Sequence, residues 1–134
     1  MTVGTPPGTG PQLVDGLWLQ GLAGGQNNTY QAGIVAAGTT QATAAPLPSG
    51  IELVEIDTVP ASSGVRLPSA IAGTELSVFN STGTTLLFYP SILNNPVTGV
   101  QDTINGATSF SVTGVGGGTT SWFACAKNGV WSAK

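Results

Sequence analysis

Short apolar runs alternate with turn-forming residues along most of this chain. From residue 28 onward, runs of about five to eight residues rich in Val, Ile, Thr and aromatic residues are separated by Gly, Pro, Asn and Ser. Such spacing is typical of β-strands joined by turns. The pattern predicts strands at residues 29–36, 40–46, 51–59, 64–67, 74–80, 84–89, 108–113, 119–126 and 130–132.

Two of the expected connections are hairpins. Residues 74–90 read TELSVFNSTGTTLLFYP, in which Ser81, Thr82 and Gly83 separate two apolar strands. Residues 122–134 read WFACAKNGVWSAK, with an Asn-Gly pair at its centre. That pair is the strongest short hairpin signal, because a type I′ turn needs positive φ at both central positions. The chain is therefore expected to end in a paired strand.

Alternation within the strands predicts one buried face on each. In ATSFSVTGV, at residues 107–115, Phe110 and Val112 are expected to point inward and the residues between them outward. No internal repeat of fixed period is evident, which argues against solenoids and propellers. We therefore expect an all-β fold, a single domain built as an antiparallel β-sandwich of jelly-roll type. Residues 38–134 form this domain, and residues 1–37 form an extended N-terminal arm and the first strand.

The first 28 residues differ in composition from the rest. Residues 1–16 are rich in Pro and Gly, and four apolar residues follow among further glycines: Leu17, Trp18, Leu19 and Leu22. The segment is too interrupted for a long helix and too apolar for a solvated linker, so we interpret it as an extended arm with an apolar anchor. Either the anchor folds back on its own domain, or it docks on a neighbouring subunit, where a buried Trp is a typical hot-spot residue. Residues 1–16 hold no cation and no apolar run, which argues against a signal peptide.

Ionisable residues are scarce. The 134 residues include three Lys and Arg, six Asp and Glu, and no His, and the net charge is −3. Without histidine, Ser-His-Asp and Cys-His catalytic groups and His-based metal sites cannot form. So few cations cannot neutralise several phosphates. We therefore expect no enzyme activity, no metal or other cofactor and no nucleic-acid partner. No run approaches the roughly 18 apolar residues that span a bilayer, so no membrane partner is expected.

The only carboxylate cluster lies in IELVEIDTV at residues 51–59, with Glu52, Glu55 and Asp57. On a strand, Glu55 and Asp57 share one face at a separation of roughly 7 Å, which is within the range of catalytic pairs in glycosidases. A solvated or subunit-facing charge pair is the commoner arrangement, and we prefer that interpretation.

Two further residues have candidate chemistry. Arg66 is the single arginine, and it either pairs with Glu55 or Asp57 or reaches across to a partner, where Arg is favoured. Cys125 lies in the apolar run WFACA and is the single cysteine, so it is expected to be a small buried hydrophobe rather than a reactive thiolate. The glycine run at residues 116–118 is expected to form a loop.

The second half of the chain contains a succession of short motifs. They are 64–68 (GVRLP), 73–78 (GTELSV), Asn80, Gly83, 86–90 (LLFYP), 102–105 (DTIN), Phe110, 123–125 (FAC) and 129–131 (GVW). This succession resembles a small β-sandwich module of tailed-bacteriophage virion proteins, and the resemblance covers roughly residues 38 to 134. A chain of about this length that contains the module resembles a capsid decoration, or cement, protein.

The resemblance implies a structural protein of the virion that binds the outside of the major capsid protein shell and stabilises it. It implies a location on the outer capsid surface, after synthesis in the host cytoplasm, and self-association as a homotrimer or alternatively a homodimer. The alternative is a phage tail or fibre module that binds host-surface glycan, with Tyr89, Trp122 or Trp131 offering ring faces to sugar. We expect capsid or intersubunit contacts at Leu17, Trp18, Leu19, Leu22, Tyr30 and Arg66.

Overall fold

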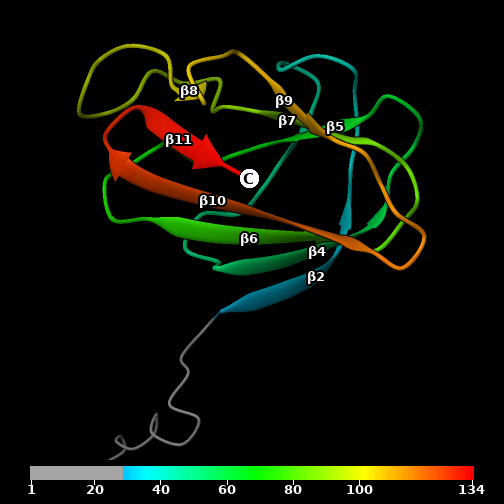
Figure 1. The fold of residues 1–134 in the computed structure, drawn as a ribbon. Helices are drawn as coiled ribbons and strands as arrows, with labels where there is room; N and C mark the ends of the chain where they lie inside the picture. Colours follow the sequence, from blue (N-terminus) through cyan, green and yellow to red (C-terminus); the bar gives the residue numbers. More distant parts are fainter. Residues whose placement is uncertain (1–28) are drawn as a thin grey trace, which may run out of the picture.

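Two β-sheets make up the part of the protein that the computed structural model describes, which is residues 29–134 (Figure 1). No helix occurs among these residues. Six strands form one sheet in the order β2-β4-β6-β10-β11-β8, and four form the other in the order β3-β5-β7-β9. The strands are β2 (Tyr30–Val35), β3 (Ala45–Pro46), β4 (Leu53–Thr58), β5 (Gly64–Arg66), β6 (Glu75–Asn80), β7 (Leu86–Tyr89), β8 (Thr103–Ile104), β9 (Phe110–Val112), β10 (Thr119–Lys127) and β11 (Val130–Ala133).

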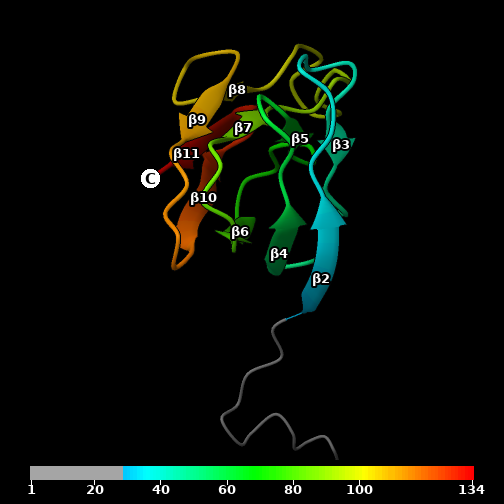
Figure 2. The ribbon, with the colours of Figure 1, turned by 90° about the vertical axis from the view of Figure 1, so that its right-hand side faces the viewer.

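The strands β2 to β7 wind as three stacked coils. At each step the chain passes from one sheet to the other, so β2, β4 and β6 lie side by side in one layer and β3, β5 and β7 in the other (Figure 2). All four pairings within these two sets are parallel. Tyr30 pairs with Leu53 and Leu53 pairs with Ser77, which are steps of 23 and 24 residues. This arrangement is a β-solenoid.

The expected antiparallel β-sandwich of jelly-roll type is therefore wrong, and so is the exclusion of solenoids. Side chains alternate between the two faces of a strand in parallel and antiparallel sheets alike, so alternation predicted the strands without their partners. In the smaller sheet Ala45 pairs with Val65 and Val65 with Phe88, which are steps of 20 and 23 residues. Because the steps differ in length, no fixed period marks the coils in the sequence.

Reversed strands close the last coil of the solenoid. β9 pairs antiparallel with β7, and β10 pairs antiparallel with β6, so the parallel stack ends in both sheets. β11 returns along β10, and β8 adds a short parallel pairing at the outer edge. At the first coil, β2 and β3 are the edge strands of their sheets. The reversed strands thus cap one end of the stack, as the terminal unit of a solenoid requires.

The hairpin at Asn128 and Gly129 is confirmed. β10 and β11 pair antiparallel across it, with Lys127 opposite Val130. Of the two central residues only Gly129 has a positive φ, 88°, so the turn is not of type I′. The register also shifts between Ala124 and Lys127, which is how the strands adjust to a turn of another type.

The hairpin expected between residues 74–80 and 84–89 is wrong, because β6 and β7 belong to different sheets. The buried Asn80 side chain shapes the corner that replaces it. Its Oδ1 accepts hydrogen bonds from the backbone N–H and the hydroxyl of Thr82, at 2.9 and 2.7 Å. Its Nδ2 donates to the carbonyl oxygen of Thr84 at 2.8 Å. These bonds satisfy the backbone while the chain turns into the other layer.

Two stretches differ from the strands that we expected. In 40–46 only Ala45–Pro46 is a strand, because Thr40 and Thr43 form a turn in which their hydroxyls lie 2.9 Å apart. Local bonding by threonine side chains competes here with strand pairing. The short strand Thr103–Ile104 was not expected, since two residues carry no periodic signal.

Apolar side chains from both sheets fill the space between the layers. The Phe88 and Phe123 ring centroids lie 4.8 Å apart, and Trp131 meets Phe123 edge to face at 6.4 Å. Phe110 packs against Phe88 and Phe123, which confirms that it points inward. The rest of this core consists of Ala36, Leu47, Val54, Ile56, Val59, Val65, Leu67, Ala70, Leu76, Val78, Leu86, Ile104 and Cys125.

Candidate functional site

The connection from β7 to β8 exposes several large apolar side chains. Monomeric proteins rarely expose large contiguous apolar patches. Where such patches occur, they often mark contact sites for other molecules. We call residues 91–100 the apolar loop. Its exposed residues are Ile92, Leu93, Val97 and Val100, with exposed fractions of 44, 70, 61 and 62%.

A buried polar pair fixes the apolar loop. The Asn95 Nδ2 donates to Asp102 Oδ1 and to the carbonyl oxygen of Ala70, each at 2.8 Å. The Asn95 Oδ1 accepts from the backbone N–H groups of Val97 and Thr98, which shapes the turn inside the loop. The second Asp102 oxygen accepts from the backbone N–H of Ala70 at 2.8 Å. Both side chains are only 1% exposed, so these bonds form in a desolvated environment where losing one is costly.

Two glutamines fix the start of the apolar loop from outside. Gln41 Nε2 donates to the carbonyl oxygens of Pro90 and Ser91, at 3.0 and 3.1 Å. Gln101 Nε2 donates to the carbonyl oxygen of Ile92 at 2.8 Å. With these contacts the loop presents its apolar side chains in one arrangement, which lowers the entropic cost of binding.

A mostly apolar groove of about 610 Å³ runs beside the start of the apolar loop, and we call it the Arg66 groove. Its walls come from the segment that follows β3, from the end of β5, from the segment before β6 and from the first loop residues. The lining residues are Pro46, Leu47, Ser49, Gly50, Arg66, Leu67, Pro68, Ser69, Ile71, Thr74, Ser91, Ile92 and Leu93.

Arg66 itself is held by the turn before β3. Its Nη1 donates to the carbonyl oxygens of Gln41 and Ala42, at 2.9 Å each. Within residues 29–134 its bonded partners are these carbonyls, and the expected alternative of a pair with Glu55 or Asp57 is not formed. The other alternative, contact with a partner, stays a prediction, and Arg66 is one of the residues that line the groove.

Tyr30 is exposed on β2 and interacts with β4. Its hydroxyl donates to Glu55 Oε1 at 2.8 Å, and this hydrogen bond, with smaller effects of desolvation and of the carboxylate charge, raises the pKa of Tyr30. Glu55 and Asp57 alternate with the buried Val54 and Ile56 along β4, so both carboxylates lie on the outward face. The structure thus places Tyr30 beside a solvated carboxylate pair, and Tyr30 is not one of the residues that line the Arg66 groove.

The four arm residues that we predicted as contacts lie outside the described residues: Leu17, Trp18, Leu19 and Leu22. Their predicted role as capsid or intersubunit contacts therefore stays a prediction.

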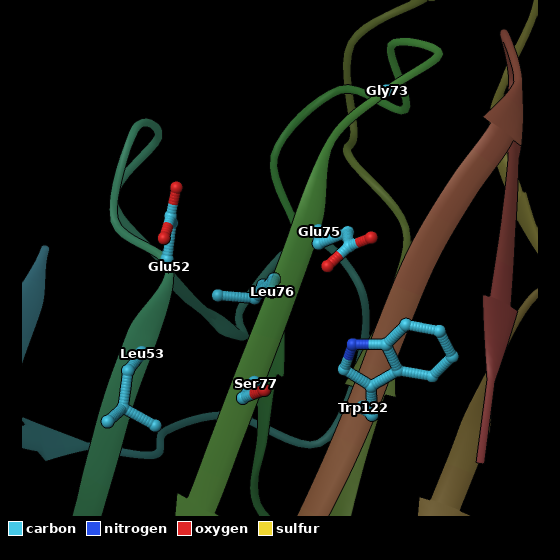
Figure 3. Close-up of a pocket in the computed structure, with 7 residues that line it drawn as sticks. All are labelled: Glu52, Leu53, Gly73, Glu75, Leu76, Ser77 and Trp122. Atoms are coloured by element: carbon cyan, nitrogen blue, oxygen red, sulfur yellow. The ribbon is translucent and has the colours of Figure 1, made fainter. Parts of the chain in front are cut away.

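A second groove, of about 390 Å³, lies on the outer face of the six-stranded sheet (Figure 3). Trp122 of β10 stands beside Ser77 of β6, and the Glu75 carboxylate lies further along the same strand. Trp122 is 39% exposed, and the Lys134 Nζ lies 5.8 Å from the centre of its ring. The lining residues are Glu52, Leu53, Gly73, Glu75, Leu76, Ser77 and Trp122.

The three rings proposed to face sugar differ in exposure. Trp131 is 0% exposed, so its ring cannot meet a ligand. Tyr89 is half-buried, and its hydroxyl donates to the carbonyl oxygen of Thr39 at 3.0 Å. Trp122 is therefore the most open of the three.

Cys125 is buried, as we predicted, and its Sγ donates to the carbonyl oxygen of Lys127 at 3.1 Å. Burial raises the pKa of the thiol, so little thiolate is present near neutral pH. We expect iodoacetamide to alkylate the folded protein at least about tenfold more slowly than the urea-unfolded chain. A time course by mass spectrometry checks this expectation, and equal rates in the two states would contradict the burial of the thiol.

The sequence-based reasoning missed the apolar loop. Residues 91–100 read SILNNPVTGV, in which four large apolar residues stand among Asn, Pro, Thr and Gly. Neither a strand period nor a helix period connects them, so the pattern predicts only a loop. The signal that would have found the site is the large apolar side chains within a turn-forming sequence.

Among residues 29–134, no group of three or more His, Cys, Asp and Glu side chains is placed to hold a metal ion. None of the elements in that part of the chain is a helix with the length and apolarity to cross a bilayer. No protein-family model, curated protein or solved structure matches this chain.

Proposed function

We propose that this protein is a capsid decoration, or cement, protein of a tailed bacteriophage, and that it binds the outside of the major capsid protein shell. The apolar loop is the observation that carries the proposal. It combines exposed apolar side chains with a backbone fixed by Asn95, Asp102 and two glutamines. Apolar anchors on a preorganised segment are suited to binding a protein surface. The resemblance of residues 38–134 to virion modules supplies the phage context.

The low charge of the chain suits the same role. With a net charge of −3 over 134 residues, contacts rest mainly on apolar side chains and depend little on salt. Many copies that each bridge neighbouring capsid subunits would add their small contributions and resist the outward pressure of packaged DNA. The protein acts in this role as a homotrimer or a homodimer, without catalysis and without a cofactor, on the outer surface of the virion.

The apolar loop supplies the first contact to test. We expect V97D/V100D to weaken binding to expanded capsids of the encoding phage by at least about tenfold, because truncating anchors at the centre of an interface typically costs more than 1 kcal/mol. Both side chains are exposed and neither lines the Arg66 groove, so the fold should tolerate the change. Co-sedimentation with capsids measures the affinity.

The matched control is V115D, since Val115 is 57% exposed and lies in the loop between β9 and β10. It should bind as the parent chain does. Failure of the parent chain to bind the shell, or its location by cryo-electron microscopy anywhere but the capsid exterior, would reject the proposal.

A glycan-binding tail or fibre module is the second candidate, and Trp122 is the observation that favours it. Its partly open ring stands beside the Glu75 carboxylate and the Ser77 hydroxyl in the smaller groove (Figure 3). Aromatic rings with nearby polar groups suit sugar rings, which present apolar faces and hydroxyl edges. Reproducible binding on a glycan array that W122A abolishes would favour this candidate over the capsid role.

A further inference from the structure

The Arg66 groove is an apolar surface left open in residues 29–134. Its accessible apolar lining comes from Pro46, Pro68, Ile71, Ile92 and Leu93, because the lining residues Leu47 and Leu67 are only 5 and 2% exposed. A groove of about 610 Å³ is within the size range of sites that enclose ligand groups. Covering it would remove apolar surface from water, which is favourable in proportion to the area buried.

The chemistry of the groove defines its occupant. Apolar walls select apolar side chains, and one guanidinium at the wall selects a carboxylate. Arg66 uses Nη1 for two carbonyl oxygens, and a guanidinium has five N–H donors in a planar fork, so it can also bind a carboxylate. The matching ligand is therefore a short peptide segment with several large apolar residues and one acidic residue.

The chain contains such a segment ahead of β2. Residues 15–22 read DGLWLQGL, which combine four large apolar residues with Asp15. Asp15 is the single carboxylate among residues 1–28. The remaining residues of that region are mostly Gly, Pro, Thr, Gln and Asn, so no other part of it matches the groove as well.

The connection to β2 brings this segment to the groove. The Thr29 hydroxyl donates to the carbonyl oxygen of Gly50 at 2.9 Å and accepts from the backbone N–H of Glu52 at 2.9 Å. Gly50 is itself a lining residue of the groove. Thr29 therefore lies beside a lining residue of the groove, and the seven residues from 22 to 29 can span at most roughly 25 Å. A tether this short gives a high effective concentration.

We propose that residues 15–22 bind in the Arg66 groove of their own subunit, with the apolar side chains against its walls and the Asp15 carboxylate on the Arg66 guanidinium. Contact with Ile92 and Leu93 then braces the start of the apolar loop, while Val97 and Val100 stay free. The sequence left two alternatives for the apolar anchor, which are folding back on its own domain and docking on a neighbouring subunit. This proposal selects the first. It does not depend on the capsid role, because it concerns a contact within one chain.

Photo-cross-linking in the full-length chain tests the contact. Benzoylphenylalanine replaces Trp18, and irradiation is followed by mapping of the linked peptides by mass spectrometry. A mixture of isotopically light and heavy chains distinguishes links within a chain from links between copies. We expect links to groove residues such as Pro46, Ile71 or Leu93, in light-light and heavy-heavy pairs only. The same reagent at Val3 is the control and should give no such links.

Three variants sharpen the test. L93D places a charge at the rim, and it should abolish most of the linking, whereas V115D should leave it unchanged. D15N removes the carboxylate and changes no residue of 29–134, and it should lower the yield about two- to fivefold, as expected for a partly exposed ion pair. Links outside the groove, links between light and heavy chains, or yields that L93D and D15N leave unchanged would each overturn the proposal. Capsid binding is measured separately, so either result can fail alone.

Discussion

Replacing Trp131 with Ala is expected to lower the free energy of unfolding by about 3–5 kcal/mol. Trp131 is 0% exposed on β11, it meets Phe123 edge to face, and its Nε1 donates to the carbonyl oxygen of Pro68 at 3.1 Å. Alanine would leave a cavity where the indole stood and a buried carbonyl without its donor, and both effects destabilise. The loss is a large part of the total stability of a typical domain.

Urea unfolding monitored by circular dichroism measures this effect, with W122A as the matched control. Trp122 is 39% exposed on the outer face of the sheet, so its removal should cost less than about 1 kcal/mol. If W131A is too unstable to purify folded, W131F keeps most of the apolar volume and should lose about 1–2 kcal/mol. Equal midpoints for the Trp131 and Trp122 variants would contradict the central place of Trp131 in the core.

The inward faces of most strands could be predicted from the sequence. Leu76 and Val78 point into the core as alternation requires, and Phe110 does so on β9. The hairpin at Asn128 and Gly129, though not its turn type, and the burial of Cys125 were also predicted correctly. These features are local, since they depend on the period of two along a strand and on the φ preference of one glycine.

Strand partners could not be predicted, because partners are not local. The segment around Asn80 illustrates this: two apolar strands separated by Ser-Thr-Gly have the sequence of a hairpin. The buried amide instead binds Thr82 and Thr84 and turns the chain into the second sheet. The alternation along the flanking strands is the same in both outcomes. One misjudged turn therefore predicted an antiparallel pair where β6 and β7 form the two sides of one coil of the solenoid.

The candidate site was predicted only through Arg66. As the single arginine it was a candidate contact, and it lies at the wall of the groove. The neighbouring apolar loop depends on Asn95 and Asp102, which are seven residues apart in sequence and bind each other in the interior. Polar residues in a turn-rich sequence are usually solvated, so the sequence pattern does not predict that Asn95 and Asp102 are buried. Their burial results from the packing of the loop on Ala70.

Replacing Asn95 with Ala should therefore release the apolar loop from its fixed conformation. We expect it to lower the free energy of unfolding by about 3–5 kcal/mol. The variant loses the two hydrogen bonds that Asn95 Nδ2 donates and the two that its Oδ1 accepts. The buried Asp102 carboxylate then keeps the hydrogen bond from the Ala70 N–H. A desolvated carboxylate that loses a donor accounts for much of this loss. Hydrogen exchange of the Val97 and Thr98 amides should accelerate with the loss.

The neighbouring N94A is the control, because Asn94 is exposed and its side chain accepts only a long contact of 3.4 Å from Gln101. It should change the free energy of unfolding by no more than about 0.5 kcal/mol. Capsid binding should fall in N95A even under conditions where it is fully folded, since a loop that must be ordered on docking loses part of its binding energy to entropy. An N95A protein with parent-like exchange at Val97 would show that the apolar loop is held by something other than the Asn95 amide.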